Sequence, residues 1–176
     1  SLQWLAVMGF LPTLIMEKFQ FTKSAASFLT ALVVAVNVIG NLAGGRLLKK
    51  GVRRWKLIAF ASFIQGLCAM AIYSDSPVFA VNYTGCLLFS IVGGLIPASI
   101  LGGVPLYAPS RRLLGTANGL AIQGGQTGQV IGPPILAYLV SQTGSWACGA
   151  WFLGGVAFLG ILAGFALSQV KKSQFE

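Results

Sequence analysis

Residues 25–73 read AASFLTALVVAVNVIGNLAGGRLLKKGVRRWKLIAFASFIQGLCAMAIY and contain two long apolar runs on either side of a basic turn. The first run extends from Ala25 to Leu48 and the second from Trp55 to Tyr73. A helix that rises about 1.5 Å per residue needs roughly 20 apolar residues to cross a hydrocarbon core about 30 Å thick. The stretch therefore predicts two membrane-spanning helices joined by a short basic loop.

Four further apolar runs flank this pair, and the six runs account for nearly the whole chain. The other runs are Leu2 to Met16, Val78 to Ala108, Leu113 to Val140 and Trp146 to Val170. The segments that connect the runs are too short to hold a separate domain. The sequence thus predicts an all-α membrane protein with a single domain, residues 1–176, made of six transmembrane helices.

The composition excludes most soluble classes of protein. Of the 176 residues, 56% are hydrophobic and only 9% are charged, and the mean hydropathy is +0.81. A soluble domain carries about 25% charged residues, so most of the surface of this chain must face lipid. The net charge of +9 does not indicate nucleic-acid binding, because the basic residues form short clusters between apolar runs and do not form one basic face of a soluble element.

The basic clusters predict the orientation of the helices. If the connections are assigned alternately to two sides, one side receives every cluster and the other receives only Lys18 and Lys23. Lys and Arg accumulate in cytoplasmic loops, so we expect both termini in the cytoplasm and the protein in the plasma or inner membrane. The clusters are Arg46, Lys49, Lys50, Arg53, Arg54 and Lys56, then Arg111 and Arg112, then Lys171 and Lys172.

The basic turn also carries a family resemblance. Residues 45–54 read GRLLKKGVRR and resemble the G-x-L-x-D-R-x-G-R-R loop motif of the major facilitator superfamily, which joins the second and third helices of each six-helix half. Lys49 stands where the family has Asp, and Gly51 comes one place early. Basic loops attract anionic lipid headgroups, so the resemblance implies contacts with membrane lipid and with the neighbouring half. The loop residues concerned are Gly45, Leu47, Lys49, Lys50, Arg53 and Arg54.

The fifth apolar run adds a second resemblance. Gly119, Gly128, Gly132 and Pro133 match G-x8-G-x3-G-P, the start of the glycine-proline helix motif of the same family. The degenerate loop motif, the absence of an Arg in the fourth run and the end of the chain soon after the sixth run favour the C-terminal half of a twelve-helix transporter. The abrupt start at Ser1 indicates a fragment, whose main partner is then the missing N-terminal six-helix half.

The residues of the fifth run also predict close packing and bending. Gly124, Gly128 and Gly132 recur at every fourth position, so they form a stripe that allows a neighbouring backbone to approach closely. Pro133 and Pro134 remove two backbone donors, and we expect them to bend the helix or to end its regular hydrogen bonding. Pro97 and Pro105 predict the same for the fourth run.

The resemblance implies a secondary active transporter that moves a small-molecule substrate by rocking two halves against each other. No acidic or basic residue lies in the middle of a run, so neutral amides are the candidates for contact with the substrate. Asn118, Gln126 and Gln129 share an arc of roughly 80° at 100° per residue. In the family, the cavity is lined mainly by the first, second, fourth and fifth helices of this half. The predicted contacts are Asn37, Asn82, Tyr83, Asn118, Gln123 and Gln126.

Other function classes have less support. The chain contains no His, and its three Cys have no spacing typical of a metal site, so neither a Ser-His protease nor a metalloenzyme is expected. We expect no cofactor. The sequence also lacks the N-P-A boxes of aquaporins and a T-V-G-Y-G filter. A self-sufficient six-helix transporter or channel that acts as a homodimer remains open as the alternative.

Overall fold

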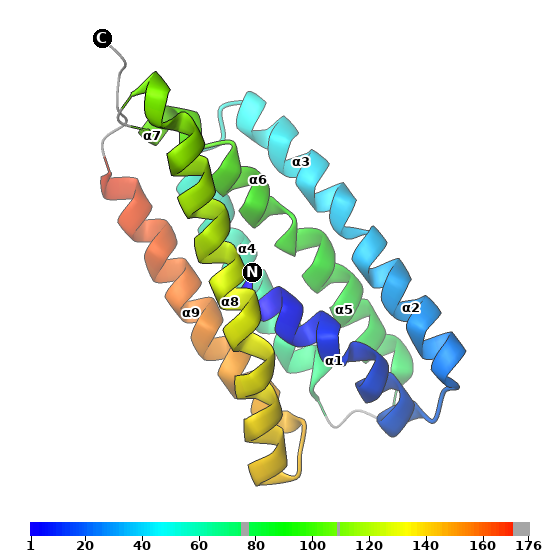
Figure 1. Ribbon diagram of the computed structural model, residues 1–176. Coiled ribbons are helices and arrows are strands. Elements are labelled where there is room, and N and C mark those ends of the chain that lie inside the picture. Colours follow the sequence, from blue (N-terminus) through cyan, green and yellow to red (C-terminus); the bar gives the residue numbers. More distant parts are fainter. Residues whose placement is uncertain (75–77, 109, 171–176) are drawn as a thin grey trace.

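A computed structural model describes residues 1–74, 78–108 and 110–170, and every regular element within these ranges is a helix (Figure 1). Each predicted apolar run corresponds to one helical segment whose bounds lie within a few residues of the run. In chain order the segments are α1 (Leu2–Phe19), α2 and α3 (Lys23–Ala35 and Asn37–Lys49), α4 (Arg54–Ile72), α5 to α7 (Phe79–Gly93, Leu95–Leu101 and Val104–Tyr107), the 3-10 turn η1 and α8 (Arg111–Leu113 and Leu114–Thr143), and α9 (Ala147–Gln169).

Four of these segments are long and apolar enough to cross a membrane. They are Lys23–Lys49, Arg54–Ile72, Phe79–Tyr107 and Ala147–Gln169. The segments α1 and α8 do not reach the same hydropathy, because Glu17 and Lys18 dilute α1 and several amides and glycines dilute α8. The all-helical membrane architecture is thus confirmed with four candidate spans. The predicted assignment of Lys171 and Lys172 lies outside the described residues.

Consecutive segments run in opposite directions, and their ends lie at two ends of the bundle, except for the start of α1, which lies near the middle (Figure 1). The end of α3, the starts of α4 and α8 and the end of α9 lie at the upper end of the view, which we call the basic end. Its described basic residues are Arg46, Lys49, Lys50, Arg53, Arg54, Lys56, Arg111 and Arg112. Lys18 and Lys23 lie at the opposite end, where α1 stops and α2 begins.

The turn after α3 explains the position of Gly51. Its φ is +86°, the left-handed conformation that glycine adopts without strain. The Gly51 N–H bonds to the carbonyl of Leu48 and the Val52 N–H to the carbonyl of Leu47, each at 3.1 Å. This pair of bonds is a Schellman motif, which satisfies the last carbonyls of the helix. Gly51 therefore ends α3 and turns the chain into the start of α4.

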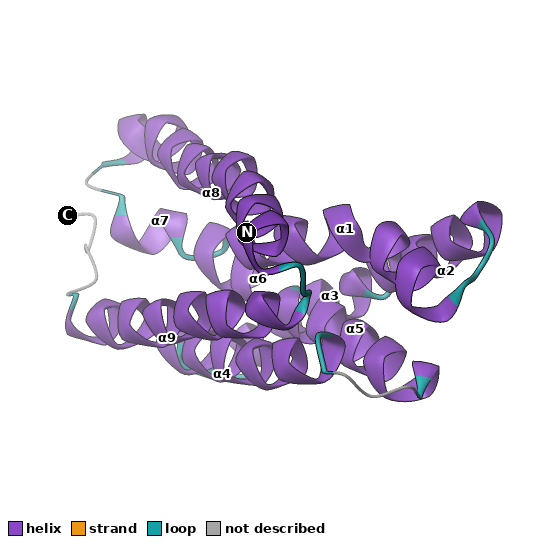
Figure 2. Ribbon diagram, turned by 90° about the horizontal axis from the view of Figure 1, so that it is seen from below, coloured by secondary structure: helices purple, strands orange, loops and turns teal. Residues whose placement is uncertain are grey.

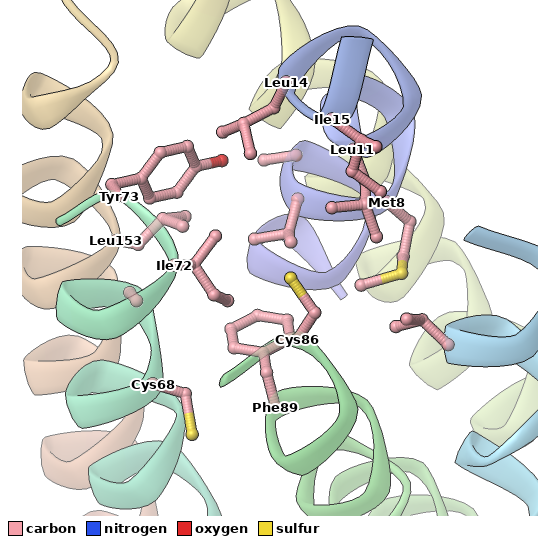
Figure 3. Packing of buried hydrophobic residues seen from close by; sticks show 14 of the residues in the cluster. Met8, Leu11, Leu14, Ile15, Cys68, Ile72, Tyr73, Cys86, Phe89 and Leu153 are labelled. Atoms are coloured by element: carbon pink, nitrogen blue, oxygen red, sulfur yellow. The ribbon is translucent and has the colours of Figure 1, made fainter. Parts of the chain in front are cut away.

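The core lies where α1, α4, α5 and α9 meet (Figure 3). Leu11 and Ile15 of α1 face Ile72 of α4 and Phe89 of α5, and all four side chains are fully buried. The two helices α4 and α9 lie side by side (Figure 2). Small residues at their contact allow this close approach, since a Cβ on Gly160 would lie 2.5 Å from the Oγ of Ser62. This small-residue contact is the kind that holds membrane helices together without a hydrophobic driving force.

Two of the helical segments are interrupted, and they cross at the interruptions. The first is interrupted at Val36, and the second at Gly94 and again at Gly102 and Gly103. A Cβ on Gly40 would lie 1.6 Å from the carbonyl oxygen of Ile91, so the backbones touch directly at this crossing. Only residues without a side chain permit such an approach.

The prolines of the fourth and fifth runs behave differently. Pro97 and Pro105 lie two or three residues beyond the interruptions at Gly94 and at Gly102 and Gly103, which agrees with the steric clash between a proline ring and the preceding turn. By contrast, α8 does not end at Pro133 and Pro134 but continues to Thr143. The carbonyls that these prolines leave without a main-chain donor are those of Gln129 and Val130, four residues earlier.

Candidate functional site

Two adjoining cavities lie between α1, the crossing of α3 with α5 and α6, and α8. The first, which we call the amide cavity, has a volume of about 210 Å³ and is lined by Ser1, Trp4, Asn37, Gln65, Gly93, Ile96, Pro97 and Gln129. The second, the α6–α8 cavity, has a volume of about 500 Å³ and includes Gln126 and Gln129 of α8 with Ile96, Pro97, Ile100 and Leu101 of α6. The two cavities share Ser1, Ile96, Pro97 and Gln129, so they form one recess.

Asn37 is placed at the recess by the crossing of the interrupted helices. Its Nδ2 donates to the carbonyl of Ser90 at 2.7 Å, and its Oδ1 accepts from the Nδ2 of Asn41 at 2.8 Å. Asn41 also donates to the carbonyl of Asn37 at 3.2 Å. The side chain of Asn37 is therefore held in one orientation, with its oxygen and nitrogen assigned by these partners.

Gln65 and Trp4 meet at Gly93. Gln65 is 2% exposed, and its Nε2 donates to the carbonyl of Phe89 at 3.5 Å. A Cβ on Gly93 would lie 2.7 Å from this Nε2 and 3.5 Å from the Cδ1 of Trp4, which adjoins the indole nitrogen. The Nε1 of Trp4 is buried and has no hydrogen-bond partner among the described residues. A buried indole N–H usually has a hydrogen-bond partner. The wall of the amide cavity therefore contains one donor, the Trp4 N–H, that lacks an acceptor within the part of the chain that the structure describes.

The α8 side of the recess carries two side-chain amides, and α8 also has main-chain carbonyls that lack an N–H donor from the next turn. Gln126 and Gln129 lie about one turn apart and both line the α6–α8 cavity. Pro133 has no N–H to offer the carbonyl of Gln129, and Pro97 has none for the carbonyl of Gly93. The residues Gln129 and Gly93, which line the amide cavity, thus each have a main-chain carbonyl without a helical N–H donor.

The side chains that line the recess carry no charge. No residue that lines either cavity is acidic or basic. Among the described residues the only carboxylate is Glu17, at the far end of α1, where its Oε2 accepts from the Nε1 of Trp146 at 3.0 Å. Any ligand in this recess would therefore be held by neutral hydrogen bonds and by apolar contact with Ile96 and Pro97.

The structure brings together some of the predicted contacts and separates others. Asn37 and Gln126 line the recess, whereas Asn118 and Gln123 lie on the exposed face of α8 and line neither cavity. The Nδ2 of Asn82 donates to the carbonyl of Ile72 at 2.7 Å, and the hydroxyl of Tyr83 donates to the carbonyl of Leu29 at 3.1 Å. Both bonds join helices near the end opposite the basic end.

The sequence prediction omitted three residues that line the recess: Trp4, Gln65 and Gln129. Gln65 lies on α4, the third segment, which does not supply the main cavity wall in the family pattern used for the prediction. The spacing of amides had already placed Gln129 on the same arc as Asn118 and Gln126, but Gln129 was left out of the predicted contacts. The signal for Trp4 was an indole N–H within the apolar run that begins at Leu2.

The glycines of α8 divide into two groups. A Cβ on Gly132 would lie 2.8 Å from the carbonyl oxygen of Leu2, and one on Gly128 would lie 3.3 Å from the Leu2 backbone. These two glycines let α1 approach α8. No atom lies within 4 Å of the corresponding position at Gly119 or Gly124, so those glycines contact no other described helix.

The predicted loop motif is distributed around the turn between α3 and α4. Lys49, Lys50 and Arg53 are exposed, and Gly45 has open space at its Cβ position. Arg54 differs, because its Nη1 donates to the carbonyl of Ser99 at 3.0 Å. The N–H of Gly103 bonds to Ile100 and not to Ser99, so the guanidinium of Arg54 takes the acceptor that the interruption after α6 leaves open.

Comparison with known proteins identifies the family. The model of the Major Facilitator Superfamily matches residues 1–175, nearly the whole chain. The chain belongs to the major facilitator superfamily. Membership in this family, with relatives named as transporters, places the chain in an integral multi-pass membrane protein and points to transport and not to an enzyme activity.

The relatives in this superfamily have names that refer to nitrite and nitrate. The chain is 31% identical over 160 residues to the nitrite extrusion protein of Bacillus subtilis, a match that covers 90% of the chain and 38% of that protein. It is 25% identical over 166 residues to a protein of Staphylococcus epidermidis named "Probable nitrate transporter NarT", covering 94% of the chain and 41% of the relative. A protein with the same name from Staphylococcus carnosus is 26% identical, with 93% and 41% covered. No solved structure matches.

Proposed function

We propose that residues 1–176 form a single domain, the C-terminal six-helix half of a secondary active transporter that moves a small solute by alternating access. The chain spans 38–41% of the length of the relatives it matches, which leaves room for a second set of helices in proteins of that length. The six helical segments alternate in direction, and the basic residues gather at one end, which supports a cytoplasmic location for that end. In this arrangement the C-terminus of the domain is cytoplasmic. The segment α1 begins at Ser1 beside the recess, in the middle of the bundle, and runs from there to the end that carries Lys18.

The observation that carries this proposal is the neutral recess beside two interrupted helices. Substrate sites of transporters commonly lie near the bilayer midplane, at helices whose regular hydrogen bonding is broken. The recess lies beside the crossing of Gly40 with Gly94 and receives amides from α3, α4 and α8. Asn37, Gln126 and Gln129 are the side chains that we assign to solute contact, and Asn118 and Gln123 are assigned to the wall that faces the other half.

The names of the relatives favour a small oxyanion, nitrite or nitrate, as the solute. The recess offers such an ion N–H donors from amides and from the Trp4 indole. It offers no cationic side chain. The charge of an anion would therefore have to be balanced by residues outside this domain or by a cotransported ion.

The experiment is a transport assay on the full-length protein reconstituted in liposomes, with nitrite and nitrate offered separately. We expect Gln126→Ala and Gln129→Ala to raise the KM about two- to tenfold, since one hydrogen bond contributes about 0.5–1.5 kcal/mol. Gln142→Ala removes the same group from the exposed end of α8 and serves as the matched control. An unchanged KM in both recess variants would contradict the assignment of the site, and transport of neither ion would remove the proposed solute class.

A further inference from the structure

A third cavity lies at the basic end, remote from the solute recess. Its volume is about 340 Å³, and it is bounded by Arg53, Arg54 and Trp55 at the start of α4, by Tyr107 at the end of α7, and by Leu167 and Val170 at the end of α9. It shares no lining residue with the amide cavity or the α6–α8 cavity. Its occupant therefore differs from the solute.

Within the part of the chain that the structure describes, the charge around this cavity is positive and no carboxylate lies beside it. Eight basic residues lie at this end among the described residues, and the one described carboxylate, Glu17, lies at the opposite end of the bundle. Arg53 is exposed, and its guanidinium has no hydrogen-bond partner within residues 1–74, 78–108 and 110–170. Arg54 uses Nη1 for the carbonyl of Ser99. The cavity thus offers a free guanidinium and the unused donors of a second.

The walls of the cavity are suited to the interface between headgroups and hydrocarbon. Trp55 lies at the start of α4, where its ring is 5.4 Å from that of Phe165 on α9, and Tyr107 lies at the end of α7. Trp and Tyr concentrate at the membrane–water interface. Leu167 and Val170 add an apolar wall that leads from the two arginines towards the hydrocarbon core.

We propose that this cavity binds the phosphate headgroup of one anionic phospholipid. The two guanidinium groups pair with the phosphate oxygens in charge-assisted hydrogen bonds, while the acyl chains follow the apolar wall of α9. Basic pockets between transmembrane helices are a known mode of headgroup recognition. Binding at this site differs from a diffuse attraction of lipid to the whole basic end, because it depends on the residues that line the cavity.

The site also has a connection to the solute recess. Arg54 contacts the headgroup cavity on one side and the carbonyl of Ser99 on the other. Ser99 belongs to α6, which supplies Ile96 and Pro97 to both cavities of the recess. A bound headgroup therefore acts on the same guanidinium that holds the end of α6.

The test is a lipid titration of the full-length protein in a neutral detergent, with thermal unfolding as the readout. We expect dioleoylphosphatidylglycerol to raise the unfolding temperature in a saturable way and dioleoylphosphatidylcholine to have little effect. Arg53→Gln should weaken the apparent affinity for phosphatidylglycerol about fivefold, as expected for one basic residue near a headgroup. The matched control is Arg112→Gln, which makes the same charge change at the same end but outside the cavity lining.

Three results would overturn the proposal. An equal loss of affinity in Arg53→Gln and Arg112→Gln would indicate diffuse surface charge. Saturation of the effect by inorganic phosphate or glycerol 1-phosphate would indicate a site for free phosphate. An equal effect of phosphatidylcholine would indicate an apolar contact alone. If Arg53→Gln fails to fold, Leu167→Trp fills the cavity without a change in charge, and it should abolish the response to phosphatidylglycerol.

Discussion

The side-chain amide of Asn37 donates to the main-chain carbonyl of Ser90 at 2.7 Å, and this bond ties two interrupted helices at the point where they cross. One turn away, Gly40 and Gly94 bring the two backbones into direct contact. The same asparagine lines the amide cavity. Asn37 therefore both fixes the crossing and lines the recess. A change at the crossing is expected to alter the shape of the recess.

We predict that Gly40→Ala destabilises the protein. The added methyl would lie 1.6 Å from the carbonyl oxygen of Ile91, so the helices must separate. Overpacking of this kind costs about 1–3 kcal/mol. The measurement is the thermal unfolding temperature of the purified protein in detergent. Gly45→Ala, in the same helix but with no atom within 4 Å of its Cβ position, is the control and should leave that temperature unchanged. Equal effects of the two variants would contradict the close crossing.

Asn82→Ala separates a structural role from a role in solute contact. Asn82 is 2% exposed, and its Nδ2 donates to the carbonyl of Ile72 at 2.7 Å and to that of Ser74 at 3.4 Å. Loss of a buried partner costs about 1–3 kcal/mol. We therefore expect a lower unfolding temperature with an unchanged KM for transport. A raised KM at unchanged stability would instead favour the sequence-based prediction that Asn82 contacts the solute.

Arg54→Gln tests the bond between the loop and the interruption after α6. Without the guanidinium, the carbonyl of Ser99 loses its 3.0 Å donor, so the main chain around Gly102 and Gly103 should open more often. The measurement is hydrogen–deuterium exchange of residues 99–104, which we expect to accelerate about two- to tenfold, in line with about 0.5–1.5 kcal/mol for one bond. Lys56→Gln at the same end is the control, and faster exchange in that variant as well would refute a specific bond.

Trp146 joins α9 to α1 and α4 at the end opposite the basic end. Its Nε1 donates to Glu17 at 3.0 Å, and its ring stacks on Tyr73 and lies 5.8 Å from the ring of Phe10. Trp146→Phe keeps the ring contacts and loses the hydrogen bond, so it should cost about 1 kcal/mol. Trp146→Ala loses two ring pairs as well, a further loss of about 1–3 kcal/mol.

Chemical denaturation in detergent measures both Trp146 variants. Glu17→Gln keeps an oxygen acceptor for the indole and is expected to be nearly neutral. If Trp146→Phe proves as destabilising as Trp146→Ala, the ring contacts contribute nothing and this explanation fails.

The sequence predicted the helical segments well because each one is a length of apolar residues between short polar turns. The bounds of α4, Arg54–Ile72, differ by one residue at each end from the predicted run Trp55 to Tyr73. The interruptions were harder to place. Pro97 indicated that the fourth run would break, but the break at Gly94 depends on contact with Gly40, a residue 54 positions earlier in the chain. Sequence alone contains no distance between those two glycines.

The site was predicted less completely, because helical periodicity gives the face of a residue but not its partner. Asn37 and Gln126 line cavities in the structure, and their contact with a solute stays a prediction. Asn82 and Tyr83 share the polar character of those residues, yet their side chains donate to main-chain carbonyls of other segments. The sequence shows that Gln65 is an amide in an apolar run. Its contact with Gly93 and Trp4 depends on how the helices pack, which the sequence does not give.

The crossing at Gly40 and Gly94 determines which relative motion of the two helical segments costs the least free energy. The closest atoms at the contact belong to the two backbones, so we expect one segment to turn on the other more easily than it slides along it. Sliding one segment along its helix axis is different, because it would stretch the 2.7 Å bond between Asn37 and Ser90. It would also bring a residue larger than Gly40 against the carbonyl of Ile91. We therefore expect the two segments to act as a pivot, in which the ends far from the crossing would move through the widest arcs.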